Sequence, residues 1–482
     1  MERLKGSFKV NVALFTFFTV ATSSYSQKVD KENRPNILLI LSDDHSFPYL
    51  SCYGDSNIKT PNLDRIAKEG IRFNRAYTTA PQSVPSRASI MTGRNVLDIQ
   101  MLRFSAPLNK NIITGPELLR AHGYYTGICG RNYHLDGSGN GPKESEEVFD
   151  KYNLRTFHKR VDYLKIDDND ATNIQQFKEF LNQVPQNKLF FLQMSLSDPH
   201  RPFTAENYNP DYKTIKVPYK FPDTEMLRQD LSTFYGEVQR LDHSIGLLLH
   251  ELEIKGFLNN TLIVFMGDNG SALLRGKGTL YEGGIHVPLL ARWPDIIKPG
   301  SVSDLLVSGE DLVPTFLDIA GIECTKEMTG QSFFSTLHGE KTDKREYIYA
   351  VRGSHGVSLP NKGSGGFDLS RAVMNEKFKL IYNPLFYLYY SPIDFGNSSF
   401  WRDLIEKNNQ GLLEKRFSKT TMFTSERPLF ELFDLENDPD EFNNLAGIKE
   451  YKEIEDELKK ELQKWMIIYR DIVPLPILSD KK

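Results

Sequence analysis

Residues 35–44 read Pro-Asn-Ile-Leu-Leu-Ile-Leu-Ser-Asp-Asp, an apolar run that ends in two acids. A half-exposed strand alternates apolar and polar residues, whereas a continuous run is typical of a strand that is covered on both faces. Comparable runs recur at residues 189–198, 261–268 and 287–292. These four runs predict buried strands of one sheet.

Helical patterns lie between these runs, at residues 63–68, 117–122 and 225–255. Alternation of buried strands with helices is the arrangement that covers both faces of a parallel sheet. The sequence therefore predicts an α/β sandwich with a large, mixed but mainly parallel sheet.

The pattern of predicted strands and helices changes after about residue 345. Short β-like pieces follow at residues 347–351, 371–374, 378–382 and 430–435, and a helical pattern covers residues 450–469. We interpret residues 346–482 as a smaller α+β subdomain with an antiparallel sheet, packed against a catalytic domain that spans residues 27–345.

Composition and charge exclude several classes of protein. The chain has 482 residues, a formal net charge of -4 and 25% charged residues, so no basic excess points to nucleic acid. Only three cysteines are present, and an odd number gives no disulfide framework. They are Cys52, Cys129 and Cys324.

The first 26 residues have the pattern of a secretory signal peptide. Basic residues precede an apolar core at residues 10–20, and Ser24 and Ser26 precede a predicted cut before Gln27. The core is too short to cross a bilayer, and no other stretch is apolar enough, so we expect a secreted protein without a membrane span once the signal is removed.

Polar residues follow two of the predicted strands. Asp43 and Asp44 end the first run, and Asp268 and Asn269 end the run that begins at Thr261. Open α/β sheets bind ligands beyond the carboxyl ends of their strands, and carboxylate and amide oxygens are hard ligands for calcium or magnesium. Taken singly, the first pair also suits a helix cap and the second a tight turn.

Residues 83–94 read Ser-Val-Pro-Ser-Arg-Ala-Ser-Ile-Met-Thr-Gly-Arg. Pro85 suits the first turn of a helix, and Ser83 just before it is a candidate cap. The positive end of that helix favours an anion, and Arg87 lies about one turn further along. The alternative is an ordinary capped helix.

This stretch resembles the activation signature of the type I sulfatases. The resemblance runs in order from Pro35 almost to the C-terminus, and it implies an alkaline-phosphatase-like sandwich in which Ser83 is oxidised to formylglycine by a maturation enzyme. It also implies one divalent cation, calcium in preference to magnesium, whose ligands are Asp43, Asp44, Ser83, Asp268 and Asn269.

An unmodified serine would not serve this chemistry. A sulfate ester on a saturated carbon needs a second substitution at sulfur for release, and the enzyme would stall. The hydrate of an aldehyde carries two hydroxyls, so one attacks sulfur and the other later loses its proton and expels sulfate. The resemblance implies that Arg87 hydrogen-bonds this hydrate.

Three further motifs match the family in order. Residues 123–134 resemble the second sulfatase signature, in which Arg131 replaces the usual lysine and His134 would help to move the proton of the hydrate. Asp-Pro-His at residues 198–200 implies that His200 protonates the leaving group. Lys277, eight residues after Asn269, corresponds to the family's sulfate-binding cation.

Several stretches resemble the heparan N-sulfatase (sulfamidase) branch, among them Asp-Pro-His-Arg at 198–201 and Arg-Pro-Leu-Phe-Glu-Leu-Phe-Asp-Leu at 427–435. This resemblance implies a sulfated saccharide as substrate, such as N-sulfoglucosamine of heparan sulfate or heparin, although an O-sulfate stays open. His355 is a candidate for reading the sugar or a surface-loop residue. We therefore expect a secreted bacterial enzyme that is located in the periplasm.

Two other functions stay open at this stage. One is a phosphoester hydrolase of the same superfamily, which uses an unmodified nucleophile and two metal ions. The other is a protein that binds a sulfated glycan without cleaving it, if Ser83 is not oxidised. The mass of the peptide around Ser83 separates these alternatives.

Overall fold

The computed structural model describes residues 34–103, 107–131, 143–154, 157–166, 170–340, 345–355 and 364–477. The predicted signal peptide and His134 lie outside these residues. No helix within the described ranges is long and apolar enough to cross a membrane.

The centre of the molecule is an eight-stranded sheet in the order β5-β4-β6-β1-β7-β8-β2-β9. Its strands are β1 (Asn36–Ser42), β2 (Ile71–Phe73), β4 (Tyr125–Gly130), β5 (Tyr163–Leu164), β6 (Phe190–Ser195), β7 (Thr261–Gly267), β8 (Leu289–Arg292) and β9 (Ser301–Ser303). β1 lies parallel to both β6 and β7, and β8 runs antiparallel to β7 and β2. The sheet is therefore mixed but mainly parallel, as the sequence predicts.

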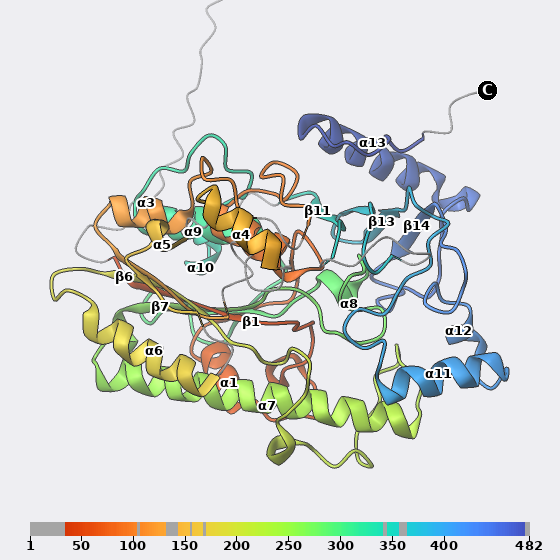
Figure 1. Cartoon of the computed structure of the whole chain (residues 1–482), viewed down its shortest axis with the longest axis horizontal. Coiled ribbons are helices and arrows are strands. Elements are labelled where there is room, and N and C mark those ends of the chain that lie inside the picture. The colour runs from red at the N-terminus through yellow and green to blue at the C-terminus, as the bar shows by residue number, and fades with distance from the viewer. Residues whose placement is uncertain are drawn as a thin grey trace, which may run out of the picture.

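Helices cover both faces of this sheet (Figure 1). α1 (Pro61–Lys68), α6 (Asp170–Gln183) and α7 (Glu225–Ile254) lie along one face, while α3 (Gly115–Ala121), α9 (Leu312–Ile319) and α10 (Phe334–Leu337) lie along the other. The remaining helices of this part are α2 (Ser83–Thr92), α4 (Lys143–Lys151), α5 (Phe157–Arg160) and α8 (Glu282–Ile285).

The two covered faces explain why residues 36–42 are apolar without a break. Leu38 and Ile40 belong to the hydrophobic cluster that contains Leu241 of α7, whereas Leu39 belongs to the cluster that contains Leu312 of α9. Successive side chains of a strand point to opposite faces, so each face of β1 needs an apolar partner.

A second, four-stranded antiparallel sheet lies to one side, in the order β11-β12-β13-β14. Its strands are β11 (Ile348–Val351), β12 (Arg371–Met374), β13 (Phe378–Tyr382) and β14 (Phe430–Asp434). The C-terminal helix α13 (Lys452–Ile468) packs on it, with Trp465 stacked on Tyr349 at a centroid distance of 4.8 Å. Helices α11 (Ser399–Asn409) and α12 (Lys415–Ser418) lie between β13 and β14 in the chain, and a small parallel pair joins β3 (Ala76–Tyr77) to β10 (Val307–Ser308).

The strand β4 is an element that the sequence analysis did not predict. It contains Gly127 and Gly130, which carry no side chain for a strand to pack. The structure shows why glycine is needed at Gly130: its φ is +83°, and a Cβ there would lie 1.9 Å from the carbonyl oxygen of Ser195 in β6. The close approach of these two strands depends on that glycine.

We expect Gly130→Ala to lower the free energy of unfolding by more than Gly123→Ala does. Both glycines have positive φ, but a Cβ added at Gly123 would have no other atom within 4 Å. Gly123→Ala should cost about 1–2 kcal/mol for backbone strain alone. Gly130→Ala should cost a further ~1–3 kcal/mol because its methyl group meets a backbone oxygen.

The urea midpoints of the two variants measure this difference. Equal losses in the two variants would contradict the close approach of β4 and β6.

Candidate active site

Two adjacent strand ends carry the acidic side chains of the site. β1 and β7 pair in parallel with Ser42 opposite Gly267, so Asp43 and Asp44 leave the sheet beside Asp268 and Asn269. All four side chains are fully buried. The structure thus brings together, at one edge of the sheet, the four residues that the sequence predicted to lie at the carboxyl ends of strands.

Hydrogen bonds fix these carboxylates relative to one another. The backbone N–H of Asp44 donates to Asp268 Oδ1 at 3.0 Å, and the amide of Asn269 donates to Asp44 Oδ1 at 2.8 Å. Asp44 also has a φ of +61°, a left-handed conformation that aspartate tolerates better than most residues. The turn after β1 is therefore held by side chains that follow β7.

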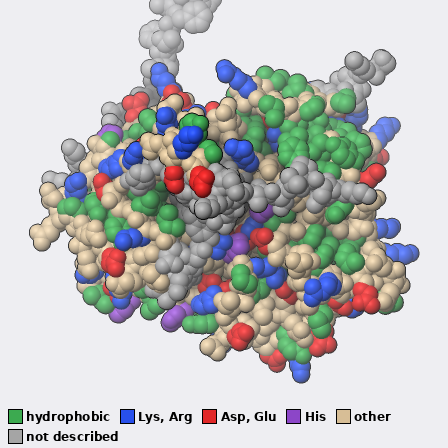
Figure 2. Space-filling view, viewed as in Figure 1, with side chains coloured by type: hydrophobic (Ala, Val, Ile, Leu, Met, Phe, Trp, Pro, Cys, Tyr) green, Lys and Arg blue, Asp and Glu red, His purple; other side chains and the backbone are tan. Residues whose placement is uncertain are grey.

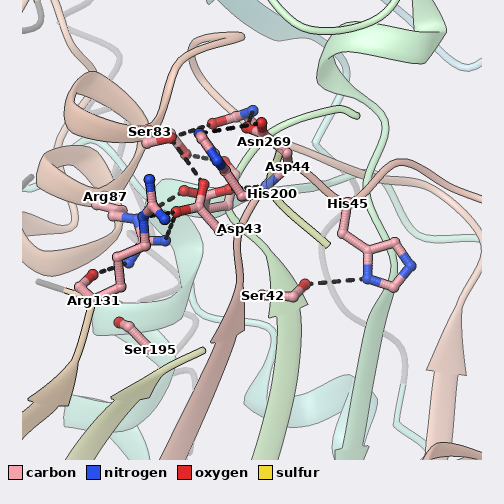
Figure 3. Close-up of polar contacts among 12 residues, drawn as sticks. Ser42, Asp43, Asp44, His45, Ser83, Arg87, Arg131, Ser195, His200 and Asn269 are labelled. Atoms are coloured by element: carbon pink, nitrogen blue, oxygen red, sulfur yellow. Dashed lines mark hydrogen bonds and ion pairs between the residues drawn. The ribbon is translucent and has the colours of Figure 1, made fainter. Parts of the chain in front are cut away.

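Ser83 reaches the same acidic cluster from α2. Its hydroxyl lies 3.2 Å from Asp43 Oδ1 and 3.0 Å from Asn269 Oδ1, and the side chain is fully buried. Figure 3 shows these side chains converging, whereas His45 points away toward Ser42. The hydroxyl of Ser83 thus adjoins the acidic cluster.

One local prediction about α2 was wrong. The helix begins at Ser83 itself, the capping position is Gln82, and Pro85 is the third helical residue. Ser83 is not a cap because its hydroxyl is directed to side chains across the site instead of to the backbone N–H groups of its own helix.

Two arginines neutralise part of the buried negative charge. Arg87 Nε lies 2.7 Å from Asp268 Oδ2, and Arg131 Nε lies 2.7 Å from Asp43 Oδ2. Arg87 also donates to the carbonyl oxygen of Arg131 at 2.8 Å. The hydrogen bond from Arg87 to the hydrate at position 83 stays a prediction, and in this structure Arg87 contacts the two carboxylates and Arg131.

A lysine and a histidine complete the cluster on another side. Lys277 Nζ lies 2.8 Å from Asp44 Oδ2 and 3.2 Å from His200 Nε2. His200 Nδ1 contacts the carbonyl oxygen of Arg201, so Nε2 is the nitrogen that faces Lys277. His200 Nε2 is also 3.6 Å from Asp44 Oδ2.

The structure adds a residue that the sequence analysis missed. Asp394, between β13 and α11, places Oδ2 2.6 Å from Lys277 Nζ and 3.7 Å from His200 Nε2. No motif in the sequence marks this aspartate, and it lies 117 residues beyond Lys277. His355, the candidate sugar reader, lies by the start of α2, with Nδ1 3.3 Å from Gln82 Nε2.

Burial and charge set the protonation of these groups. Burial raises the pKa of Asp44 to about 7, although Lys277 opposes this shift. Burial and the neighbouring Asp43 raise the pKa of Asp268 to about 6. Burial would lower the pKa of Lys277, but Asp394 and Asp44 outweigh it and hold that pKa above its ordinary value.

His200 is neutral at pH 7 in this environment. Burial lowers its pKa to about 4, and the positive charge of Lys277 lowers it as well. A neutral ring accepts a hydrogen bond at Nε2, which is consistent with the ammonium of Lys277 as its donor.

The side chains fit a divalent cation. Ligand atoms of Asp43, Asp44 and His200 lie within 4.8 Å of one another, and Asp268 and Asn269 add two further hard oxygens to the cluster. The raised pKa values of Asp44 and Asp268 show how unfavourable it is to bury several carboxylates together. A cation at this position would stabilise their ionised forms.

Comparisons with known proteins agree with this architecture. The Sulfatase family model matches residues 35–322, and a model described as N-sulphoglucosamine sulphohydrolase, C-terminal, matches residues 274–382 and 354–467. An ulvan-active sulfatase of Formosa agariphila is 28% identical over 480 residues, which cover 92% of this chain and 76% of the relative.

Two further similarities concern glucosamine-related proteins. The N-sulphoglucosamine sulphohydrolase of Homo sapiens is 29% identical over 473 residues, with 89% of each chain covered. A solved structure of a protein in complex with its substrate D-glucosamine-2-N,6-O-disulfate matches with a TM-score of 0.68 at 22% identity, over 91% of this chain and 99% of that one. The second similarity is one of fold alone.

We expect calcium to raise the unfolding temperature of chelator-treated protein. A ligand that binds only the folded state stabilises it by about 2.7 kcal/mol at 100 times its dissociation constant. Asp268→Asn and Asp44→Asn, which each remove a buried carboxylate, should lose most of this shift.

The control is Asp304→Asn, which removes an exposed carboxylate whose partner is Asn74. It should keep the full calcium-dependent shift. A shift of the same size in all the variants would mean that calcium binds elsewhere.

Proposed function

The chain belongs to the sulfatase family, and we propose that it hydrolyses sulfate groups from glycosaminoglycan saccharides, with the N-sulfonate of glucosamine as its preferred substrate. The single observation that carries the proposal is the position of Ser83 against Asp43 and Asn269, at the acidic cluster. An ordinary buried serine has no need of such an environment.

The side chains around Ser83 divide into two groups, namely cations and hydrogen-bond acceptors for the Ser83 hydroxyl. The cations Lys277 and Arg131 suit the oxygens of a sulfate, which is an anion at all physiological pH values. The hydrogen-bond partners Asp43 and Asn269 hold position 83 in one orientation. Catalysis of this kind depends on groups that are already placed where charge develops.

Formylglycine at position 83 would supply a hydrate that serves as nucleophile and then releases sulfate without attack by water on sulfur. Asp43, Asp44, Asp268 and Asn269 would hold the divalent cation. We propose that a maturation enzyme oxidises Ser83 and that the protein is secreted, into a bacterial periplasm, where sulfated glycans reach it.

His200 is proposed as the general acid. Its ring is neutral in this structure, but an anionic sulfate beside it would favour the protonated form and raise its pKa. Nε2 is already hydrogen-bonded to the ammonium of Lys277 and lies at the partly exposed side of the cluster. A proton transferred from Nε2 to the departing nitrogen or oxygen would let the sugar leave as a neutral amine or alcohol.

Two comparisons support an amino sugar as substrate. The C-terminal part of the chain matches the model of N-sulphoglucosamine sulphohydrolases, and the human relative of that name is covered over 89% of both chains. The ulvan-active relative favours a second candidate, a sulfated saccharide of ulvan. The choice between these substrates is made by a direct assay.

We expect purified protein from a host with the maturation enzyme to release sulfate from N-sulfoglucosamine faster than from 6-O-sulfo-N-acetylglucosamine or ulvan oligosaccharides. Ser83→Ala should lower the release at least about 10³-fold while the unfolding temperature stays within a few degrees. In the wild-type protein, the peptide that contains Ser83 should be lighter by two hydrogens.

An unmodified Ser83 in active protein would overturn the proposed chemistry. Faster release from ulvan oligosaccharides would reassign the substrate and leave the chemistry in place. Phosphate release from phosphoesters by the unmodified protein would favour a phosphoester hydrolase.

We expect His200→Ala to damage the turnover of sugar sulfates more than that of 4-nitrophenyl sulfate. General acid catalysis contributes about 10²–10⁴-fold when the leaving group is a poor one, and an activated phenol hardly needs the proton. The ratio of kcat/KM for the two substrates measures this difference.

His250→Ala, an exposed histidine on α7, is the matched control and should change neither value. Equal losses on both substrates would show that His200 has another role, such as binding the sulfate.

A further inference from the structure

Asp394 is a carboxylate from the C-terminal part of the chain that lies inside the candidate active site. Its Oδ2 is 2.6 Å from Lys277 Nζ and 3.7 Å from His200 Nε2. Its side chain is 31% exposed, whereas that of Asp44, on the other side of Lys277, is fully buried. Asp394 therefore stands at the open side of the Lys277–His200 pair.

One oxygen of Asp394 is left for a ligand. Both of its contacts, with Lys277 and with His200, use Oδ2. Within the described part of the chain no hydrogen bond or ion pair uses Oδ1, and the side chain as a whole is partly exposed. Figure 2 shows histidine, acidic and basic side chains gathered near the middle of one face of the molecule.

The backbone around Asp394 is held in place by packing on both sides. Ile393 and Phe395 are buried, and Phe395 stacks on Phe400 at a centroid distance of 5.5 Å. Asp394 itself has a φ of +64°. A left-handed conformation costs free energy in a residue other than glycine and persists where the surroundings impose it.

The loop that carries Lys277 packs closely against the segment around Asp394. Gly278, next to Lys277, has a φ of +80°, and a Cβ there would lie 2.6 Å from Ile393 Cγ1. Its carbonyl oxygen accepts a hydrogen bond from Arg352 Nε at 3.0 Å. Ile393, next to Asp394, therefore packs directly against Gly278, next to Lys277. This contact fixes the position of Asp394 relative to Lys277.

The charge of Asp394 decides which part of a substrate it meets. Its Oδ2 pairs with the ammonium of Lys277 at 2.6 Å, and this contact favours the ionised carboxylate. An anion does not bind a sulfate oxygen. A carboxylate at the open side of the Lys277–His200 pair instead accepts hydrogen bonds from neutral or cationic donors.

We propose, on the basis of the function proposed above, that Asp394 is a specificity-determining residue that accepts a hydrogen bond from a hydroxyl on the carbon next to the sulfated position. The substrate class is then a saccharide with a free hydroxyl adjacent to its sulfate group. An aryl sulfate without such a hydroxyl gains nothing from Asp394.

The alternative to a specificity role is that Asp394 only positions Lys277. Asp394 contacts Lys277, so its loss would also change the sulfate-binding cation, and turnover of every sulfate would fall alike. A specificity role instead makes the loss depend on the substrate. The two roles are separated by substrates that differ in one hydroxyl.

The variant Asp394→Asn removes the charge and keeps the shape. Asparagine tolerates positive φ as well as aspartate does, so the backbone is not strained, unlike in Asp394→Ala. Glu406→Gln, which removes an exposed carboxylate on α11, is the matched control and should behave as the wild type.

The substrates are the methyl glycoside of N-sulfoglucosamine, its 3-deoxy analogue and 4-nitrophenyl sulfate. In the wild type, we expect kcat/KM to be about 10- to 100-fold higher for the glycoside than for the 3-deoxy analogue, as for a hydrogen bond to a charged group. Asp394→Asn should lose this preference, with the change mainly in KM. Its turnover of 4-nitrophenyl sulfate should fall less than its turnover of the glycoside, because Asp394 acts on the aryl sulfate only through its ion pair with Lys277.

A binding measurement repeats the test without turnover. In the Ser83→Ala background, the ratio of dissociation constants for the two glycosides should fall about 10-fold or more when Asp394→Asn is added. An unchanged ratio, or equal losses on all three substrates, would overturn the specificity role. Absence of sulfate release from all three substrates by the wild type would instead overturn the proposed function, while the binding ratio still decides the role of Asp394.

Discussion

The burial of three carboxylates side by side is the constraint on which the rest of the site depends. Asp43, Asp44 and Asp268 are removed from water at the ends of β1 and β7. Charges in such a place are strongly unfavourable unless they are paired and hydrogen-bonded. Arg87, Arg131 and Lys277 supply positive charge from three different segments, and the hydroxyl of Ser83 lies at the edge of this arrangement.

The C-terminal part of the chain completes the site and is tied to it by buried ion pairs. Lys379 of β13, which is fully buried, lies 2.6 Å from Glu282 Oε1 of α8 and 2.9 Å from Glu441 Oε1. Removal of either partner from such a buried pair would leave an uncompensated charge. These contacts hold the small sheet against the large domain, and the segment of Asp394 therefore has a fixed place beside Lys277. The site thus combines residues of the large domain with Asp394 of the C-terminal part.

Much of the fold was predictable from local patterns. The four apolar runs are strands β1, β6, β7 and β8, and the short C-terminal pieces are the four strands of the second sheet. These elements leave a periodic or continuous apolar signal because their burial repeats along the chain. β4 was missed because two of its six residues are glycines, whose role becomes visible only when Ser195 of β6 lies against Gly130.

The sequence by itself showed which strands end in polar residues, and it showed the motif at Ser83 and the basic residues of the other motifs. Each of these features consists of residues that are neighbours in the chain. Only the tertiary structure decided how these groups pair: that Arg87 meets Asp268, that Ser83 begins its helix instead of capping it, and that Asp394 joins Lys277 from 117 residues away. The physical reason is that a local pattern reports the burial of a segment, whereas a contact between distant segments depends on the packing of every element between them.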